Sequence, residues 1–286
     1  MGGWFFSHWR RLEDTGAQNH PLVGKNPQSF GKVNSVRSTC SGERGKMAEP
    51  ALAETPNIGG TADCPVLIEE STPARLTVRQ VRDVYSRLAP LYGLWQKLAQ
   101  GRSQEVALEL ADVRNGDRVL EVAVGPGTAL ESLARSNPAG ATIGMDLTPA
   151  MVERARRRLQ RGSLTRPALC QCDARFLPFA NQSFDLVLAS YLLDLLSTAD
   201  IASAVAEMSR VLRPAGRLVL VHLSRGNLWF DRLWGFLYWL APEMLGGSRP
   251  IQLAAYLPSA GFTVAASRRI VQLGIPAEVI LARRTP

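Results

Sequence analysis

Apolar residues recur along the chain with two different periods, which separate predicted helices from predicted strands. From Val78 to Leu98 they return at steps of three and four, which predicts one helix with a buried face, bent or broken at Pro90. A second helix is expected at about Ser103–Leu110, followed by the turn signal Asn115-Gly116-Asp117. These two helices predict a helical cap in front of the main sheet.

Beyond this cap, short apolar runs alternate with amphipathic segments. The runs predict strands at Arg118–Val124, Ala141–Met145, Ala168–Cys172, Phe184–Ala189, Arg217–Leu223, Gly261–Val271 and Glu278–Arg283. Helices are expected at Thr128–Arg135, at Pro149–Leu159, and at Thr198–Leu212, the last closed by the turn Arg213–Gly216. Apolar strands separated by helices are typical of a parallel sheet covered on both faces. The expected fold is therefore a doubly wound, Rossmann-like α/β domain with a mostly parallel sheet of seven strands.

The first part of the chain lacks both periods. Residues 1–74 are rich in Gly, Ser, Asn, Pro and Thr, which predicts a disordered tail ahead of a domain over residues 75–286. The tail only weakly resembles a mitochondrial transit peptide, because such peptides are poor in acidic residues and the tail contains Glu13, Asp14 and Glu43. Met47 is an alternative start of translation. We expect a cytoplasmic protein, with peripheral membrane contact as an alternative.

Composition narrows the classes of partner. The formal net charge is +8, but the arginines are scattered and not interleaved with aromatic residues, so no nucleic-acid partner is expected. Of the four cysteines only Cys170 and Cys172 are close together, and Cys-Gln-Cys is not a zinc-ligand spacing. No metal is expected, and the thiols are interpreted as free in a reducing compartment. The oligomeric state stays open.

The segment Val119–Thr128 reads as a strand, a glycine-rich turn and the start of a helix. Glycines at 125 and 127 let a ligand approach the backbone, and the helix start adds unpaired N–H groups. A nicotinamide dinucleotide site would need a third glycine, but Leu130 stands there. Glu121, inside the strand, can face an ammonium group of a ligand.

Further acidic residues follow the next two strands. Asp146 ends the second strand, nineteen residues after Gly127, where a carboxylate can accept both hydroxyls of a ribose. Its alternative role is a helix N-cap, for which Thr148 before Pro149 is the better candidate. Asp173 follows the third strand, where it can accept from an adenine amino group. Because successive parallel strands end at one edge, these acids predict one ligand crevice.

As a set, four strings resemble the motifs of class I S-adenosylmethionine-dependent methyltransferases, above all the ubiquinone/menaquinone biosynthesis C-methyltransferase branch. The strings are Val119–Thr128, Gly144–Leu159, Asp173–Ser190 and Val211–Val221, with Arg87–Tyr92 resembling that branch's N-terminal segment. The resemblance covers about residues 80–286. It departs from the family at Ala123, where the first glycine of the loop usually stands.

The resemblance implies a set of cofactor-binding residues. Those implied for the methionine portion are Glu121, Ala123, Gly125 and Gly127; for the ribose side, Asp146 with Leu147; for adenine, Asp173 with Ala174; and under the sulfonium, Ser190. The implied activity is methyl transfer from S-adenosylmethionine to a small, apolar or aromatic acceptor, quinone-like or lipid-like.

A catalytic base is needed only if the nucleophile must lose a proton. Candidates near strand ends are Tyr191, Asp194 and His222; His222 is a base or a satisfied polar residue at the rim, and Tyr191 is first a pocket wall. The aromatic run Leu228–Leu240 is core, a substrate lid within residues 228–257, or a membrane-surface helix. Two rival functions remain: an NAD(P)-dependent oxidoreductase, and a catalytically silent cofactor-binding regulatory subunit.

Overall fold

The computed structural model describes residues 73–164 and 166–285, and the predicted disordered tail lies almost wholly outside them. Two helices come first, α2 (Val78–Ala99) and α3 (Gly101–Ala111), and α2 runs through Pro90 without a break in its helical assignment. Thr77 caps α2: its side chain accepts from the backbone N of Gln80, and the Gln80 side chain accepts from the backbone N of Thr77. This reciprocal capping fixes where the helix begins.

The remaining elements alternate as predicted, with boundaries shifted by a few residues. The strands are β1 (Arg118–Val122), β2 (Ala141–Asp146), β3 (Ala168–Gln171), β4 (Phe184–Ser190), β5 (Leu212–Leu223), β6 (Phe262–Gln272) and β7 (Ile275–Arg284). The helices are α4 (Thr128–Ser136), α5 (Pro149–Arg161), α6 (Thr198–Val211) and α7 (Leu228–Leu240), with short 3-10 turns η1 (Leu193–Leu195), η2 (Pro242–Leu245), η3 (Leu253–Tyr256) and η4 (Pro258–Ala260).

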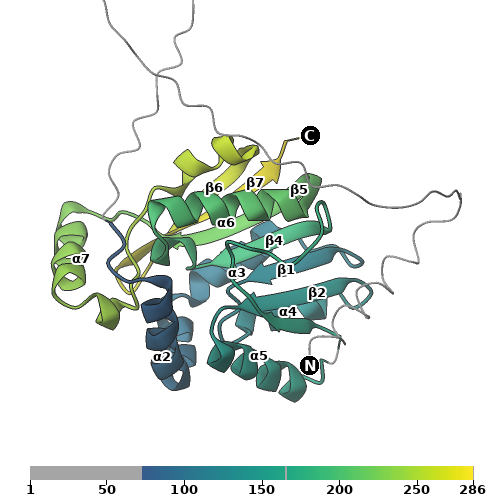
Figure 1. Ribbon diagram of the computed structural model, residues 1–286, viewed down its shortest axis with the longest axis horizontal. Helices are drawn as coiled ribbons and strands as arrows, with labels where there is room; N and C mark the ends of the chain where they lie inside the picture. The colour runs from purple at the N-terminus through teal and green to yellow at the C-terminus, as the bar shows by residue number, and fades with distance from the viewer. Residues whose placement is uncertain (1–72, 165, 286) are drawn as a thin grey trace, which may run out of the picture. The chain divides into compact units, whose positions relative to one another are not determined.

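The seven strands form one sheet in the order β3-β2-β1-β4-β5-β7-β6. Strands β1 to β5 are parallel to one another, and β7 is antiparallel to both β5 and β6. Strands β2 and β3 are added on one side of β1 and the later strands on the other side, so the topological switch point lies between β1 and β4 (Figure 1). The expected doubly wound α/β fold is confirmed.

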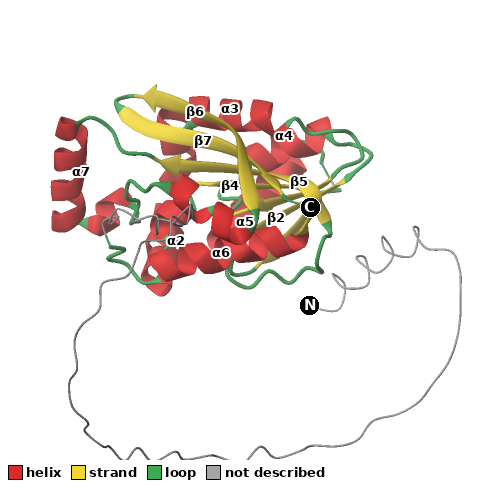
Figure 2. Ribbon diagram, turned by 90° about the horizontal axis from the view of Figure 1, so that it is seen from above, coloured by secondary structure: helices red, strands yellow, loops and turns green. Residues whose placement is uncertain are grey.

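Helices cover both faces of the sheet, with α3 and α4 on one side and α6 on the other (Figure 2). The main core cluster joins small residues of α3 and α4 to branched residues of the central strands. Its buried members are Ala107, Ala111, Ala129, Leu133, Val119, Leu186, Leu188, Val219, Val221 and Val279. Small residues on α3 let the helix lie close to the sheet. Because helices cover both faces, the central strands are buried on both sides, and this is why they read as continuous apolar runs in the sequence.

One predicted turn is wrong. Residues 213–216 belong to β5, which begins directly at Leu212 after α6. The register against β4 shifts between Phe184 and Leu186, and Ala215 has a φ of 59°. This irregularity takes up the extra residues, so Pro214 and Gly216 sit in a bulged strand rather than a free turn.

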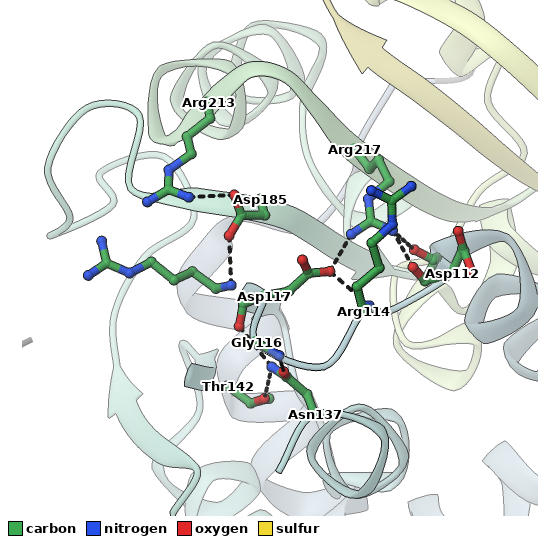
Figure 3. Close-up of polar contacts among 11 residues, drawn as sticks. Asp112, Arg114, Gly116, Asp117, Asn137, Thr142, Asp185, Arg213 and Arg217 are labelled. Atoms are coloured by element: carbon green, nitrogen blue, oxygen red, sulfur yellow. Dashed lines mark hydrogen bonds and ion pairs between the residues drawn. The ribbon is translucent and has the colours of Figure 1, made fainter. Parts of the chain in front are cut away.

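A polar cluster holds the starts of the strands together (Figure 3). Arg217 of β5 is buried; its guanidinium donates to the carbonyls of Ala111 and Asp112 and pairs with Asp117. Asp185 of β4 accepts from Arg213 at 2.6 Å and from the backbone N of Arg118 at 2.8 Å. The cluster lies at the amino ends of the parallel strands, opposite the edge where ligands are expected.

Candidate functional site

The predicted acids meet at the carboxyl edge of the parallel strands. Glu121 of β1 pairs in register with Gly144 of β2, and Asp146 pairs with Gln171 of β3. Because these strands are parallel, Glu121, Asp146 and Asp173 follow one another along the same edge. Glu121 and Asp146 are buried, and Asp173 is half-buried.

A cavity of about 90 Å³, here called cavity 1, opens at this edge. Eight of the predicted site residues line it: Ala123, Gly125, Asp146, Leu147, Asp173, Ala174, Ser190 and Tyr191. Glu121, Gly127 and His222 do not line it. Gly127 is the residue before α4, and Glu121 is in β1, two residues before Ala123.

Asp146 joins the glycine-rich turn to the start of α5. Its Oδ2 accepts from the backbone N of Gly125 at 2.9 Å, and its Oδ1 accepts from the backbone N of Thr148 at 2.8 Å. Burial raises the pKa of this carboxyl, although the two backbone hydrogen bonds act in the opposite direction. Thr148 occupies the N-cap position of α5 but makes no capping bond with its side chain. The Thr148 side chain also donates to this carboxylate, and the lone pairs that remain can accept from a ligand hydroxyl.

Glu121 has a carboxylate oxygen that makes no hydrogen bond to the described residues. Its Oε2 has no hydrogen-bond partner within the described part of the chain. Burial, and secondarily the nearby Asp146, raise the pKa of Glu121 well above its usual range. A buried carboxyl in this state favours a cationic ligand, because an ammonium group would both neutralise it and donate to it.

Asp173 stays ionised for a different reason. Burial acts to raise its pKa, but hydrogen bonds from Arg175 outweigh this and hold the pKa below the ordinary value. Arg175 contacts Asp173 at 2.7 Å and Asp200 of α6 at 2.8 Å. Asp173 is therefore a fixed, ionised acceptor on the cavity wall.

The backbone explains two small residues in the turn. Ala123 has a φ of 59°, a left-handed conformation that glycine adopts without strain, which accounts for the glycine usual in the family the motifs resemble. Gly127 has a φ of 83°, and a Cβ there would lie 2.9 Å from Cα of Ala155 on α5. Gly127 thus lets α4 and α5 approach each other behind the ligand edge.

A second cavity of about 290 Å³, cavity 2, adjoins the first, and Tyr85 and Tyr191 line both. The Tyr191 hydroxyl lies 2.8 Å from Oγ of Ser103, which in turn donates to the carbonyl of Gln100. Of the described residues, those around cavity 2 include no Asp, Glu, Lys or Arg. Cavity 2 is thus suited to an uncharged molecule.

His222 lies apart from both cavities. It is fully buried, whereas the sequence suggested the rim, and its Nε2 is 3.4 Å from Oε2 of Glu278 on β7. This contact lowers the pKa of Glu278 to about 2. His222 is therefore not placed to act as the catalytic base. Asp194, the other candidate, is also buried and lines neither cavity; it accepts from Oγ of Ser248, a residue of cavity 2, at 2.5 Å.

The aromatic helix α7 is not a core element. Only Tyr238 of its residues is buried, and Trp234 contributes to cavity 2. Of the three alternatives for this segment, core packing is wrong, because α7 lies at one end of the domain, beyond the sheet (Figures 1 and 2).

Several lining residues of cavity 1 were not predicted. They are Val78, Val81, Arg82 and Tyr85 of α2, Met145 of β2, Met151 of α5, Leu195 of η1, and Thr148, Cys172, Leu192 and Leu196 from the segments between elements. The period of α2 predicted a buried face, but nothing in it indicated that this face covers a ligand site. Cys172, with its Sγ 3.6 Å from that of Cys170, could have been found from its place beside Asp173.

Residues 119–216 match the family described as "Methyltransferase domain". A ubiquinone/menaquinone biosynthesis C-methyltransferase of Teredinibacter turnerae is 32% identical over 162 residues, which are 54% of this chain and 64% of that protein. The chain thus matches less than two thirds of this relative's length.

Solved structures share the fold. A [4+2]-cyclase has a TM-score of 0.61 at 18% identity, covering 75% of this chain and 98% of its own. The N-methyltransferase NodS from Bradyrhizobium japonicum, in complex with S-adenosyl-L-homocysteine, has a TM-score of 0.52 at 18% identity, covering 65% of this chain and 88% of its own. At such identities the likeness concerns the fold.

Proposed function

Taking the chain as a relative of the class I S-adenosylmethionine-dependent methyltransferases, we propose that it transfers a methyl group from S-adenosylmethionine to a small apolar or aromatic acceptor. The catalytic domain is residues 75–286. The observation that carries this proposal is the row of acids at the carboxyl edge of the sheet: Asp146 and Asp173 line cavity 1, and buried Glu121, whose Oε2 has no partner among the described residues, lies close to Asp146. A cofactor with an ammonium group, a ribose and an adenine requires three such acceptors in succession.

The residues present fit this cofactor. Glu121 would accept from the ammonium group, with the backbone of Ala123, Gly125 and Gly127 around the methionine portion. Asp146, followed by Leu147, would hold the ribose hydroxyls. Asp173 with Ala174 would hold adenine, and Ser190 would lie under the sulfonium. When bound, S-adenosylmethionine supplies an electrophilic methyl group.

Cavity 2 is the proposed acceptor site, since it shares Tyr85 and Tyr191 with cavity 1. An uncharged, largely apolar lining favours a hydrophobic acceptor, quinone-like or lipid-like, over a carboxylate, phosphate or amine. Tyr191 forms the wall between the sites, and its hydroxyl, held by Ser103, orients the acceptor. Catalysis then comes mainly from alignment and from exclusion of water by α2.

Calorimetric titration of the protein with S-adenosylmethionine, S-adenosylhomocysteine and NADH tests the cofactor. Binding of the first two and not of NADH is expected; tight binding of NADH alone would favour the oxidoreductase. The fold also serves a cyclase, so methyl transfer needs its own test. Release of S-adenosylhomocysteine with apolar phenols or hydroquinones separates an enzyme from a silent regulatory subunit.

A further inference from the structure

The exposed apolar side chains of the domain gather in one region. Among the described residues, all the exposed large hydrophobic side chains except Phe176 and Val264 come from three places: the middle and end of α2, the segment α7–η2, and the β6–β7 turn with the end of β6. These three places meet around cavity 2, which Leu88 of α2, Trp234 of α7 and Ile275 of β7 all line. The domain thus presents one apolar surface with cavity 2 in its midst, here called the apolar end.

Helix α7 presents its apolar side outward. Trp229 is 71% exposed and Trp239 is 65% exposed, whereas Tyr238 is buried against the domain. A surface helix in water normally turns its polar side outward, and an exposed apolar area of this kind marks an interaction site. The one acidic residue of the helix, Asp231, points toward the segment before the helix, because its Oδ1 accepts from the backbone N of Gly226 at 2.8 Å.

Two arginines lie along α7 at this end of the domain. Arg232 is exposed on α7, and Arg75 lies beside the helix, where its backbone N donates to the Tyr238 hydroxyl at 3.0 Å and its guanidinium donates to the carbonyl of Trp239. Glu243 of η2 is the exposed acid next to them. Tryptophan with arginine is typical of helices in the headgroup region, because the rings sit at the apolar boundary and the guanidinium reaches the phosphates.

The length of α7 determines how it can meet a bilayer. Its 13 residues extend about 20 Å, less than the roughly 30 Å of hydrocarbon that a spanning helix must cross. None of the described helices is long and apolar enough to span a membrane. A helix of this kind lies in the plane of the interface.

We propose that the apolar end docks on the surface of an anionic lipid bilayer, with α7 and the β6–β7 turn embedded among the headgroups. Cavity 2, bordered by Met244 of η2 and Ile275, then opens toward the lipid. Resting on the proposed function, this orientation gives a lipid-soluble acceptor a direct route to the site without crossing water.

Flotation of the full chain with vesicles tests the docking. The double variant Trp229→Gln/Trp239→Gln should bind mixed phosphatidylcholine–phosphatidylglycerol vesicles about tenfold more weakly, because two interfacial rings are lost. Phe176→Gln is the matched control, since Phe176 is 73% exposed outside the apolar end and should float like wild type. Vesicles of phosphatidylcholine alone should bind the wild type more weakly.

Three results would overturn the proposal: a wild type that does not float, a folded double variant that floats undiminished, or a wild-type dimer that the same substitutions dissociate. If the melting temperature of the double variant falls, Leu240→Gln/Met244→Gln is the second probe, because both side chains are strongly exposed. Calorimetric affinity for S-adenosylmethionine, measured without lipid, reports separately on the proposed function. Vesicle binding without cofactor binding would refute that function and leave the docking intact.

Discussion

Replacing Glu121 with Gln should change stability and cofactor binding in opposite directions. In the ligand-free protein the Glu121 carboxyl is buried beside Asp146 and its Oε2 has no partner among the described residues, so its ionised form is destabilising. A glutamine of the same shape removes the charge. At neutral pH we expect the free energy of unfolding to rise by about 1–3 kcal/mol, because the neutral amide avoids both the desolvation of a buried carboxylate and its repulsion by Asp146.

The effect should depend on pH in a defined direction. Because the pKa of Glu121 is raised in the folded state, the protonated carboxyl contributes its full stability below about pH 4.5, the ordinary value. That contribution is lost as the pH rises through the folded pKa. The stability difference between Glu121→Gln and wild type should therefore be small in acid and grow toward neutral pH.

Binding should respond in the opposite sense. Loss of a charge-assisted bond to the ammonium group costs about 1.5–3 kcal/mol, a roughly tenfold to 150-fold weaker affinity for S-adenosylmethionine. Urea unfolding across the pH range and calorimetry at neutral pH measure the two effects. Asp194→Asn is the control, because Asp194 is a second buried acid that lines neither cavity, and its cofactor affinity should stay at the wild-type value. A less stable Glu121→Gln protein with unchanged affinity would refute the reasoning.

Three further substitutions probe the site and its support. Asp146→Ala should weaken S-adenosylmethionine binding by about 1–3 kcal/mol in calorimetry, and unchanged affinity in a folded variant would show that the ribose assignment is wrong. Ala123→Gly should raise the free energy of unfolding by up to about 1 kcal/mol, because relief of a left-handed alanine outweighs the added chain entropy, whereas the helical control Ala129→Gly should lower it. Arg217→Met should lower the free energy of unfolding by about 3–5 kcal/mol by removing the cation that pairs with Asp117 and the donor to the Ala111 carbonyl, with cofactor affinity retained; a parallel loss of affinity would contradict the separation of the two sheet edges.

Most of the fold could be predicted because its signals are local. Periodicity and turn residues located every strand and each main helix except α7. The aromatic run of α7 did not indicate which side of the helix faces the domain. The Arg213–Gly216 turn was mistaken because Pro and Gly also occur in a strand bulge, and only the register against β4 distinguishes the two.

Within the candidate site, the residues at strand ends could be predicted and the covering residues could not. Asp146 and Asp173 follow from the order of parallel strands, whereas Tyr85 reaches cavity 1 through tertiary packing of α2. His222 shows the same limit: a polar residue near a strand end gives no indication of its partner, and Glu278 comes from an antiparallel strand far along the chain.

The Arg217–Asp117 cluster at the strand starts has a consequence for how the protein can be altered. It ties β1, β4, β5 and the end of α3 together at the edge opposite the cavities (Figure 3). Substitutions that strengthen this cluster would raise the free energy of unfolding without altering the ligand site. A more stable protein stays folded when destabilising substitutions are made elsewhere. A directed-evolution library aimed at new acceptors should therefore begin from a background reinforced around Asp117 and vary the walls of cavity 2.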